Sequence, residues 1–262
     1  MTKHLFLTVV LLSQFIGLAF GQKYELPKLT PGHKTFVYSA YTVLFDTKNN
    51  IPRWVAWTYS KSKLPKAVSA RSGNTFSPDP NLGELSPTHA HYTNSGYDRG
   101  HICPANECSW SGKALLESFY MSNVCPQTPA LNRAKGRKGL GSAWRTVEEK
   151  CEGPWVQLYD IMYIVAGPIP GEMRGTIPFC EGKSILVPKR FFKAIVGERK
   201  GRYHGIGFIF TQDCKVSIVS IDEVERQARL DLFCNLPKRI QEKVESVSSF
   251  SESDWPGLSV IK

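Results

Sequence analysis

Tyr97-Asp98-Arg99-Gly100-His101 places a carboxylate, a permanent cation, a glycine and an imidazole next to one another. An imidazole can act as a general base near neutral pH, and glycine allows close backbone approach or unusual dihedral angles. After a helix-like span, the stretches 119–123 and 131–133 add two side-chain amides, whose oxygens suit a hard divalent cation such as Mg²⁺. A base, an arginine and an oxygen-ligated metal ion are the minimum set for attack of water on a phosphodiester.

These motifs, in this order, resemble the DNA/RNA non-specific endonucleases of the ββα-metal type, which carry an Asp-Arg-Gly-His signature. The similarity begins near Arg71, includes Asp98–His101, Phe119–Gln127 and Leu131–Asn132, and continues more loosely to Leu236. The resemblance implies an α+β fold: one domain with a mixed or antiparallel sheet core and a ββα-metal active-site motif. It also implies a hydrolase that cleaves DNA and RNA with little sequence preference and leaves 5′-phosphate ends.

The resemblance assigns the two central roles to His101 and Asn132. His101 corresponds to the general base that takes a proton from the attacking water. Asn132 corresponds to the ligand of Mg²⁺, or of Mn²⁺ in its place, and the metal ion would stabilise the leaving 3′-oxygen. The residues alone leave other readings open, because His101 could be structural and asparagine also caps helix N-termini well.

Four further positions have supporting roles by resemblance. Asn123 would orient the site through hydrogen bonds, and Asp98 would fix its neighbours. Arg99 and Arg71 would hold the phosphate, because a guanidinium fork matches its oxygens. Each position has a plainer alternative: a turn residue at Asn123, a structural carboxylate at Asp98, and solvent-exposed arginines at Arg71 and Arg99.

One acidic position departs from the family pattern. The family carries a glutamate about two turns after the asparagine on the same helix, where it orients metal-bound water. Here the nearest match is Glu148, with Glu149 as its rival, and the intervening Arg133–Ser142 is basic and rich in glycine. We expect this insertion to loop out, so that Glu148 returns to the site. The loop could also contact the nucleic-acid backbone.

Charge and the N-terminal segment indicate a partner and a compartment. The 262-residue chain has a formal net charge of +10 and a pI near 9.2, which favours polyanions such as nucleic acid. Residues 1–21 combine a short basic start, an apolar run and small residues before Gln22, as in a secretory signal peptide. We expect cleavage there, no membrane anchor afterwards, a domain over 22–262, and a secreted or periplasmic protein.

All seven cysteines follow the expected signal peptide. Export permits disulfides, but their pairing cannot be deduced from the sequence, and an odd number leaves at least one thiol unpaired within a monomer. The spacing of His101, Cys103, Cys108 and Cys125 differs from that of zinc sites. We therefore expect disulfides or buried thiols rather than structural zinc.

Hydrophobic patterning predicts strands and helices along most of 22–262, except over 60–96, which we expect to be mostly loop. In the first half we expect a hairpin formed by strands Phe36–Phe45 and Trp54–Tyr59. Around the motifs we expect two further strands, 97–103 and Phe119–Val124, and two helices, one over Trp110–Ser118 and one that begins at about Ala130–Asn132. In the second half of the chain we expect helices over Asp222–Phe233 and 237–248, and either a strand or a helix over Lys189–Val196. We also expect four strands there: Val156–Ala166, Ser184–Val187, Gly205–Thr211 and Val216–Ile221.

The leading hypothesis is an exported, Mg²⁺-dependent endonuclease with DNA and RNA as substrates. The main alternative is a non-catalytic, secreted nucleic-acid-binding protein that retains the nuclease fold, and the displacement of Glu148 is its only support. Intact Asp98–His101 and Asn132 argue against it, because binding alone needs neither a base nor a metal ion. A phosphodiesterase for small substrates is a third reading, since a fold does not fix a substrate.

Overall fold

The computed structural model describes residues 23–65, 75–133, 142–180 and 182–261. The expected signal peptide, Arg71 and residues 134–141 of the glycine-rich insertion lie outside these ranges. Within them, no helix is both long enough and apolar enough to cross a bilayer.

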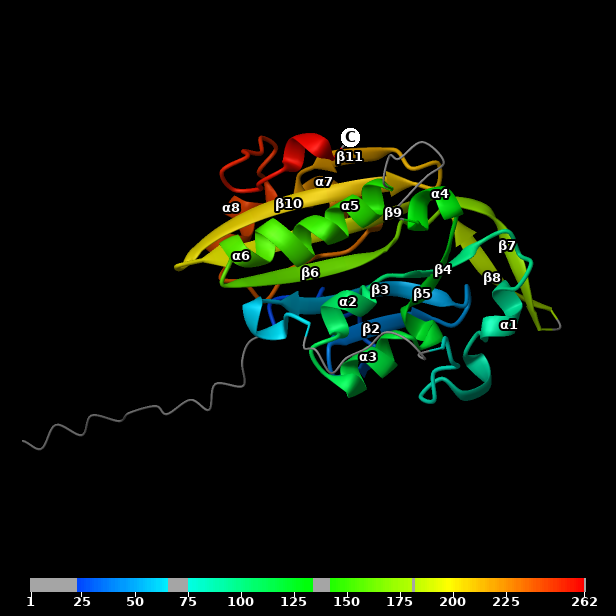
Figure 1. Ribbon diagram of the computed structural model, residues 1–262. Helices are drawn as coiled ribbons and strands as arrows, with labels where there is room; N and C mark the ends of the chain where they lie inside the picture. Colours follow the sequence, from blue (N-terminus) through cyan, green and yellow to red (C-terminus); the bar gives the residue numbers. More distant parts are fainter. Residues whose placement is uncertain (1–22, 66–74, 134–141, 181, 262) are drawn as a thin grey trace, which may run out of the picture.

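A long antiparallel sheet forms the centre of the described chain (Figure 1). Its seven strands are ordered β1-β2-β3-β6-β9-β10-β11, and every neighbouring pair is antiparallel. The sheet and its flanking helices confirm the predicted α+β class. The strands are β1 (Thr35–Val37), β2 (Tyr41–Asp46), β3 (Ile51–Tyr59), β6 (Ile161–Pro168), β9 (Arg190–Arg199), β10 (Arg202–Thr211) and β11 (Val216–Val219).

The central strands are covered on both faces. Strand β6 is buried along almost its whole length, and its successive residues enter different apolar clusters. Ile164 packs on one face with Ile195 and Phe208, whereas Val165 packs on the other with Ala194. This alternation follows from the two-residue period of a strand, and it explains why β6 and β9 are almost continuously apolar in sequence.

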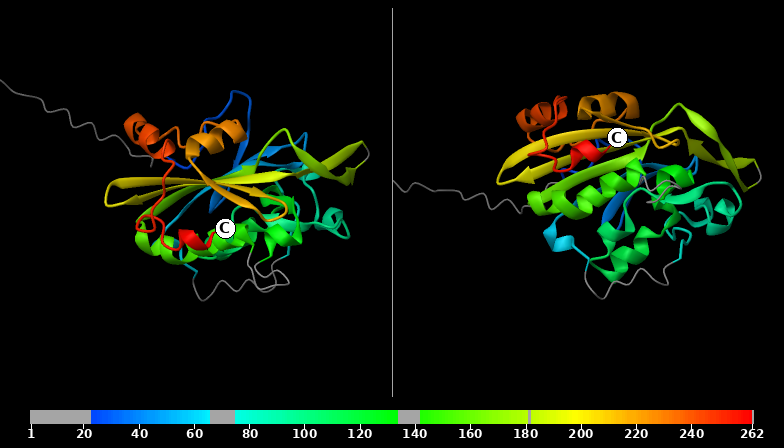
Figure 2. Two further views of the ribbon diagram at one scale, coloured as in Figure 1. Left: turned by 90° about the horizontal axis from the view of Figure 1, so that it is seen from above. Right: turned by 45° about the horizontal axis from the view of Figure 1, so that its top comes forward.

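The two faces carry different helices (Figure 2). Helices α7 (Ile221–Ala228) and α8 (Lys238–Glu245) cover one face and contact β10. The opposite face carries the β4–β5 pair and its helices, which are β4 (Asp98–His101), α2 (Ala105–Cys108), α3 (Gly112–Ser118), β5 (Val124–Gln127), α4 (Pro129–Asn132), α5 (Ala143–Lys150) and α6 (Val156–Leu158). Trp255 returns the chain terminus to this second face by packing on Trp155.

A separate hairpin lies at one end of the sheet beside helix α1 (His89–Tyr92) (Figure 1). It consists of β7 (Met173–Cys180) and β8 (Lys183–Pro188). The ring of His91 contacts Phe179 edge-on at 5.0 Å, which joins the hairpin to α1. Single turns of 3₁₀ helix occupy Lys61–Lys63, Gly83–Leu85, Met121–Asn123 and Leu258–Val260.

Three predicted elements have different boundaries in the structure. A strand over Phe119–Val124 is wrong: α3 ends at Ser118, a 3₁₀ turn follows, and β5 begins only at Val124. The strand predicted from Val156 begins at Ile161, because α5 continues through a π-helical turn (Cys151–Trp155) into α6. Helix α7 ends at Ala228, since Arg229 adopts a left-handed φ of 52°.

Candidate active site

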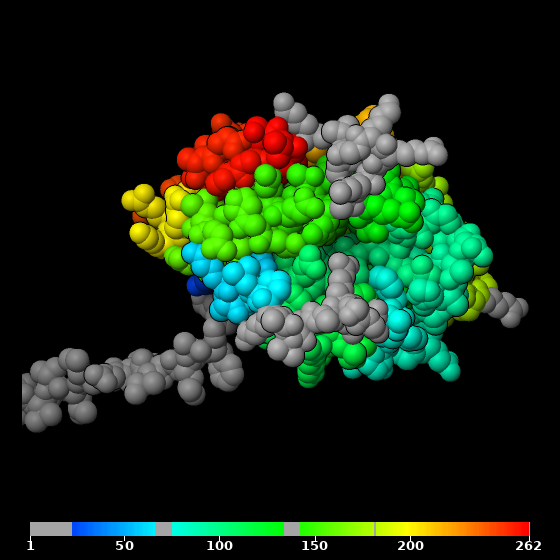
Figure 3. All heavy atoms as spheres, viewed as in Figure 1, coloured from blue at the N-terminus to red at the C-terminus, as the bar shows by residue number. Residues whose placement is uncertain are grey.

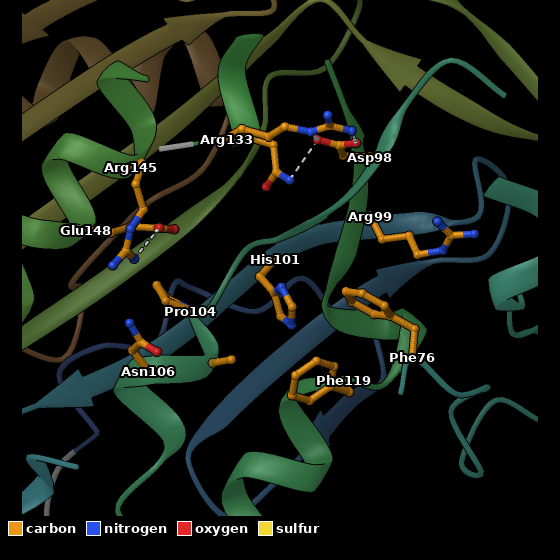
Figure 4. Close-up of a pocket in the computed structure, with 12 residues that line it drawn as sticks. Phe76, Asp98, Arg99, His101, Pro104, Asn106, Phe119, Arg133, Arg145 and Glu148 are labelled. Atoms are coloured by element: carbon orange, nitrogen blue, oxygen red, sulfur yellow. Dashed lines mark hydrogen bonds and ion pairs between the residues drawn. The ribbon is translucent and has the colours of Figure 1, made fainter. Parts of the chain in front are cut away.

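The β4–β5–α4 unit and α5 surround a cavity of about 480 Å³ (Figure 4). Strand β4 pairs antiparallel with β5, and α4 follows β5 directly, which gives the strand–strand–helix order that the resemblance implies. In the space-filling view the surface is hollowed between α5 and the segments around β4 (Figure 3). His101, Asn132 and Glu148 all line this cavity although they come from three separate elements.

Gly100 is required by close packing rather than by an unusual dihedral angle. It pairs with Cys125 across β4 and β5, and a Cβ at this position would overlap the buried side chain of Gln127. The structure therefore supports close approach, the first of the two roles that glycine can play here.

His101 lies at the end of β4 and projects into the cavity (Figure 4). Its ring contacts Phe76 at 4.9 Å and Phe119 at 5.0 Å between ring centroids. These two aromatic side chains limit rotation of the imidazole and exclude water from its flanks. The packing therefore presents a ring of defined orientation to whatever enters the cavity.

Asp98 and Arg133 fix the side chain of Asn132. Arg133 donates two hydrogen bonds to the carboxylate of Asp98, at 2.8 and 2.7 Å, and Nδ2 of Asn132 donates a third at 3.1 Å. Burial alone would raise the pKa of Asp98, but these hydrogen bonds and the arginine charge lower it below its usual value. The carboxylate therefore stays ionised, and the amide of Asn132 is held by its nitrogen, which leaves Oδ1 for another ligand.

Glu148, rather than Glu149, faces the cavity. The side chain of Glu148 lines it and is 8% exposed, whereas the side chain of Glu149 is 55% exposed. Helix α5 begins after the insertion, and Ser142 is its N-cap. The Ser142 hydroxyl accepts a hydrogen bond from the backbone N–H of Arg145 at 3.0 Å and donates one to the carbonyl of Leu131 in α4. The cap thus joins α5 to the helix that carries Asn132, and the displaced glutamate returns to the site.

Arg99 and Asn123 occupy positions that the sequence did not specify. The guanidinium of Arg99 points away from His101 and donates to the carbonyl of His89 and to Oγ1 of Thr93, at 2.5 and 2.9 Å (Figure 4). Asn123 is fully buried and bonds both backbone groups of Cys103 at 2.9 Å. Its amide therefore holds the backbone two residues beyond His101 instead of lining the cavity.

Sequence reasoning missed a polar network beside Glu148. Arg145 donates to Glu148 at 3.1 Å and twice to Glu152 at 2.9 Å, and Asn106 donates to Glu152 at 3.0 Å. The spacing of residues 145, 148 and 152 places them on one helical face, so their proximity was predictable. Asn106 carried no comparable local signal, because it reaches the network from α2.

Lys193 was also missed, and it is fully buried under the site. Its ammonium lies 4.3 Å from the ring centroid of Trp144, 5.8 Å from that of Trp57 and 3.8 Å from Oε1 of Glu148. Trp57 also donates to the buried carboxyl of Glu107 at 2.5 Å. Burial raises the pKa of Glu107 to about 8, although the charge of Lys193 opposes the shift.

The donor set of the cavity fits a hard divalent metal ion. Asn132 offers an amide oxygen and Glu148 a carboxylate, and such oxygen ligands are preferred by Mg²⁺ and Mn²⁺. The thiols of Cys103 and Cys108, which were considered above as zinc ligands, are buried, and their sulfurs lie 3.5 Å apart. The cavity thus combines an imidazole, oxygen ligands and arginines, a combination suited to hydrolysis of a phosphate ester.

Comparison with known proteins agrees with this chemistry. The family model for DNA/RNA non-specific endonucleases matches residues 24–239. A Nostoc nuclease is 29% identical over 84% of this chain and 80% of its own length, and mitochondrial nuclease 1 of Schizosaccharomyces pombe is 28% identical over 77% and 66%. Human mitochondrial endonuclease G is 28% identical over 68% of this chain and 59% of its own. A solved EndoG/EndoGI complex contains a chain with a TM-score of 0.67 and 25% identity, covering 84% of this chain and 92% of that one.

Proposed function

Since the chain belongs to the DNA/RNA non-specific endonuclease family, whose members are metal-dependent nucleases, we propose that it is an Mg²⁺-dependent endonuclease acting on both DNA and RNA. The observation that carries the proposal is the convergence of His101, Asn132 and Glu148 on one cavity. Mn²⁺ can replace Mg²⁺ in this scheme, because both are hard cations that accept oxygen ligands.

In the proposed mechanism, His101 acts as the general base. An imidazole nitrogen takes a proton from a water molecule in the cavity, and that water attacks the phosphorus in line with the leaving 3′-oxygen. The contacts with Phe76 and Phe119 keep the ring oriented for this transfer. Mg²⁺ bound through Oδ1 of Asn132 would supply positive charge to the phosphate oxygens and to the leaving oxygen.

The remaining residues bind and position. Asp98 holds the amide of Asn132, Glu148 would orient water in the cavity, and Asn123 fixes the backbone after His101. Arg99, which lines the cavity, and Arg71, outside the described residues, would hold the phosphodiester backbone. The position of Glu148 in the cavity supports the catalytic proposal over a non-catalytic binding protein.

The proposal is tested by a nicking assay with supercoiled plasmid, single-stranded RNA and a dinucleotide-like phosphodiester. Each substrate is incubated with Mg²⁺, with Mn²⁺ and with EDTA. We expect cleavage of plasmid and RNA that needs the metal ion and falls by about 10²–10⁴-fold in His101→Ala. The control is His33→Ala, because His33 is exposed and lies outside the cavity. Nucleic acid that shifts on a gel without being cleaved would favour a non-catalytic binding protein. Hydrolysis of the dinucleotide-like ester alone would favour a phosphodiesterase for small substrates.

Binding should also depend steeply on salt. Non-specific nucleic-acid affinity is dominated by phosphate contacts, so log Kd should rise linearly with log salt, with a slope of about 0.7–0.9 per phosphate contacted. The measurement is fluorescence anisotropy with a labelled oligonucleotide and His101→Ala, which prevents cleavage during the titration. An affinity that is insensitive to salt would contradict a binding mode based on Arg99, Arg133 and the net charge of +10.

We further propose that residues 1–21 are a cleaved signal peptide, that 22–262 is the mature domain, and that the protein is secreted or periplasmic. N-terminal sequencing of protein exported by an expressing cell would test this directly. A mature chain that begins at Gln22 is expected. Retention of Met1 in the exported protein would contradict the proposal.

A further inference from the structure

Three carboxylates meet on the face of the sheet opposite the candidate active site. Asp222 and Glu225 lie one turn apart on α7, and Glu245 is the last residue of α8. One oxygen of each lies within 4.8 Å of an oxygen of the other two. Both helices pack on β10 and lie next to each other (Figure 2), so the cluster joins two elements that the sheet holds in place.

The cluster has a buried floor and an open mouth. Asp222 is exposed and Glu225 half-buried, whereas Glu245 is only 6% exposed. Oε1 of Glu245 is inaccessible to solvent and has no hydrogen-bond partner among the described residues. A buried carboxylate oxygen without a partner is unfavourable, so its position beside two other carboxylates points to a missing positive ligand.

Among the described residues, no cationic side chain forms an ion pair with the cluster. Of the ion pairs within the described chain, none includes Asp222, Glu225 or Glu245, and the nearby Lys28 pairs with Asp231 instead. Within the described chain, the three carboxylates therefore have no positive partner unless a cation binds among them.

We propose that Asp222, Glu225 and Glu245 bind a calcium ion that links α7 to α8. An all-oxygen set excludes the soft metals, and Ca²⁺ accepts irregular geometry with six to eight oxygens, whereas Mg²⁺ demands a near-ideal octahedron. The backbone N–H of Leu232 donates to Oε1 of Glu225 at 2.5 Å, which orients this carboxylate and leaves Oε2 for the ion. Water completes the shell on the side of the exposed Asp222.

The proposed ion has a structural role that is separate from hydrolysis. Helices α7 and α8 cover the apolar cluster that contains Val224 and Val244, on the face away from His101. A cation that binds both helices only in the folded chain stabilises that chain by mass action. Calcium should therefore protect the protein from unfolding without being required for cleavage of nucleic acid.

The test is calorimetric titration of the EDTA-treated full chain with CaCl₂, together with thermal unfolding. Glu245→Gln is the main variant, and Glu242→Gln is its matched control, because Glu242 is an exposed glutamate on the same helix that pairs with Lys238. We expect Glu245→Gln to bind one Ca²⁺ fewer than the wild type. At Ca²⁺ about tenfold above Kd, Tm of the wild type and Glu242→Gln should rise by about 3 °C or more, and that of Glu245→Gln should not.

Further variants separate this site from the active site and from misfolding. Asn132→Ala removes the proposed catalytic ligand, so it should keep the calcium-dependent rise in Tm. Asp222→Asn changes an exposed side chain and should weaken the same binding event at least about tenfold, a loss of about 1.4 kcal/mol, even if Glu245→Gln does not fold. Equal Ca²⁺ stoichiometry and equal Tm shifts in the wild type and Asp222→Asn would overturn the proposal.

Discussion

Glu148 and Glu149 are adjacent in sequence, yet only Glu148 faces the cavity. We predict that Glu148→Gln lowers kcat by about 10–100-fold, as is usual for residues that orient a metal-bound water or ligand. Glu149→Gln should leave kcat within about twofold, because its carboxylate makes only a solvent-exposed pair with Arg145. Steady-state kinetics on plasmid DNA compare the two variants, and equal losses would show that the glutamates have been assigned wrongly.

The buried ammonium of Lys193 gives a second prediction at the residue scale. Lys193→Met should reduce the free energy of unfolding by about 2 kcal/mol or more, because Glu148 loses a buried partner at 3.8 Å. In the Glu148→Gln background the same substitution should cost less, since no buried charge is then left behind. Urea unfolding of both single variants and of the double variant gives the coupling energy. Strictly additive effects would mean that the two side chains do not interact.

At the scale of elements, the cap of α5 controls the position of the site. Ser142→Ala should cost about 1 kcal/mol of stability, because Arg145 N loses its acceptor, and it should also lower kcat, because α5 carries Glu148. Ser220→Ala is the matched control: Ser220 caps α7 through Glu223 N at 3.1 Å, on the other face of the sheet. Both variants should lose similar stability in urea, but only Ser142→Ala should lose activity.

Element boundaries illustrate how far local patterns can be trusted. The single strand predicted over Phe36–Phe45 is divided into β1 and β2, whereas the Trp54–Tyr59 prediction corresponds to β3 and the predicted helix at 237–248 to α8. The strand predicted at Phe119–Val124 failed because the amide of Asn123 bonds the carbonyls of Ser118 and Cys103, which closes a turn there. A run of apolar residues cannot reveal such a contact, since one partner lies 20 residues away.

At the scale of the whole molecule, two buried glutamates, Glu107 and Glu245, and the half-buried Glu225 predict how stability varies with pH. Their carboxyls ionise near 4.5 when unperturbed, but the fold raises the pKa of Glu107 and Glu245 to about 8 and that of Glu225 to about 7. Their contribution to stability is thus complete below about pH 4.5 and is lost as the pH rises through 7 and 8. In EDTA, the free energy of unfolding should fall over this window.

Urea unfolding at several pH values checks this prediction. Glu245→Gln should show a shallower fall than the wild type, whereas Glu242→Gln should follow the wild type. A stability that increases between about pH 5 and pH 8 would contradict the buried-carboxyl explanation, because carboxylates with lowered pKa values, such as Asp98 and Glu223, change their contribution only at lower pH.

The sequence by itself determined the family, the α+β class and most of the elements of the sheet. The family and the α+β class follow from the resemblance carried by Asp98–His101 and Asn132, and most strands and helices follow from their different periods of burial. The stretch Tyr97–His101 needs no distant partner to be recognised. The net charge of +10 depends only on composition, so the sequence was also enough to indicate a polyanionic partner.

Only the tertiary structure decided which side chains meet. It brought Glu148 to the cavity after the insertion, turned Arg99 toward His89, buried Lys193 beneath Glu148, and placed Glu245 beside Asp222 and Glu225. The Lys193–Glu148 contact joins β9 to α5, and the carboxylate cluster joins α7 to α8, so both depend on how helices pack on opposite faces of one sheet. A local pattern records which face of its own element a residue occupies, but the neighbour across that face is fixed only when the whole chain packs.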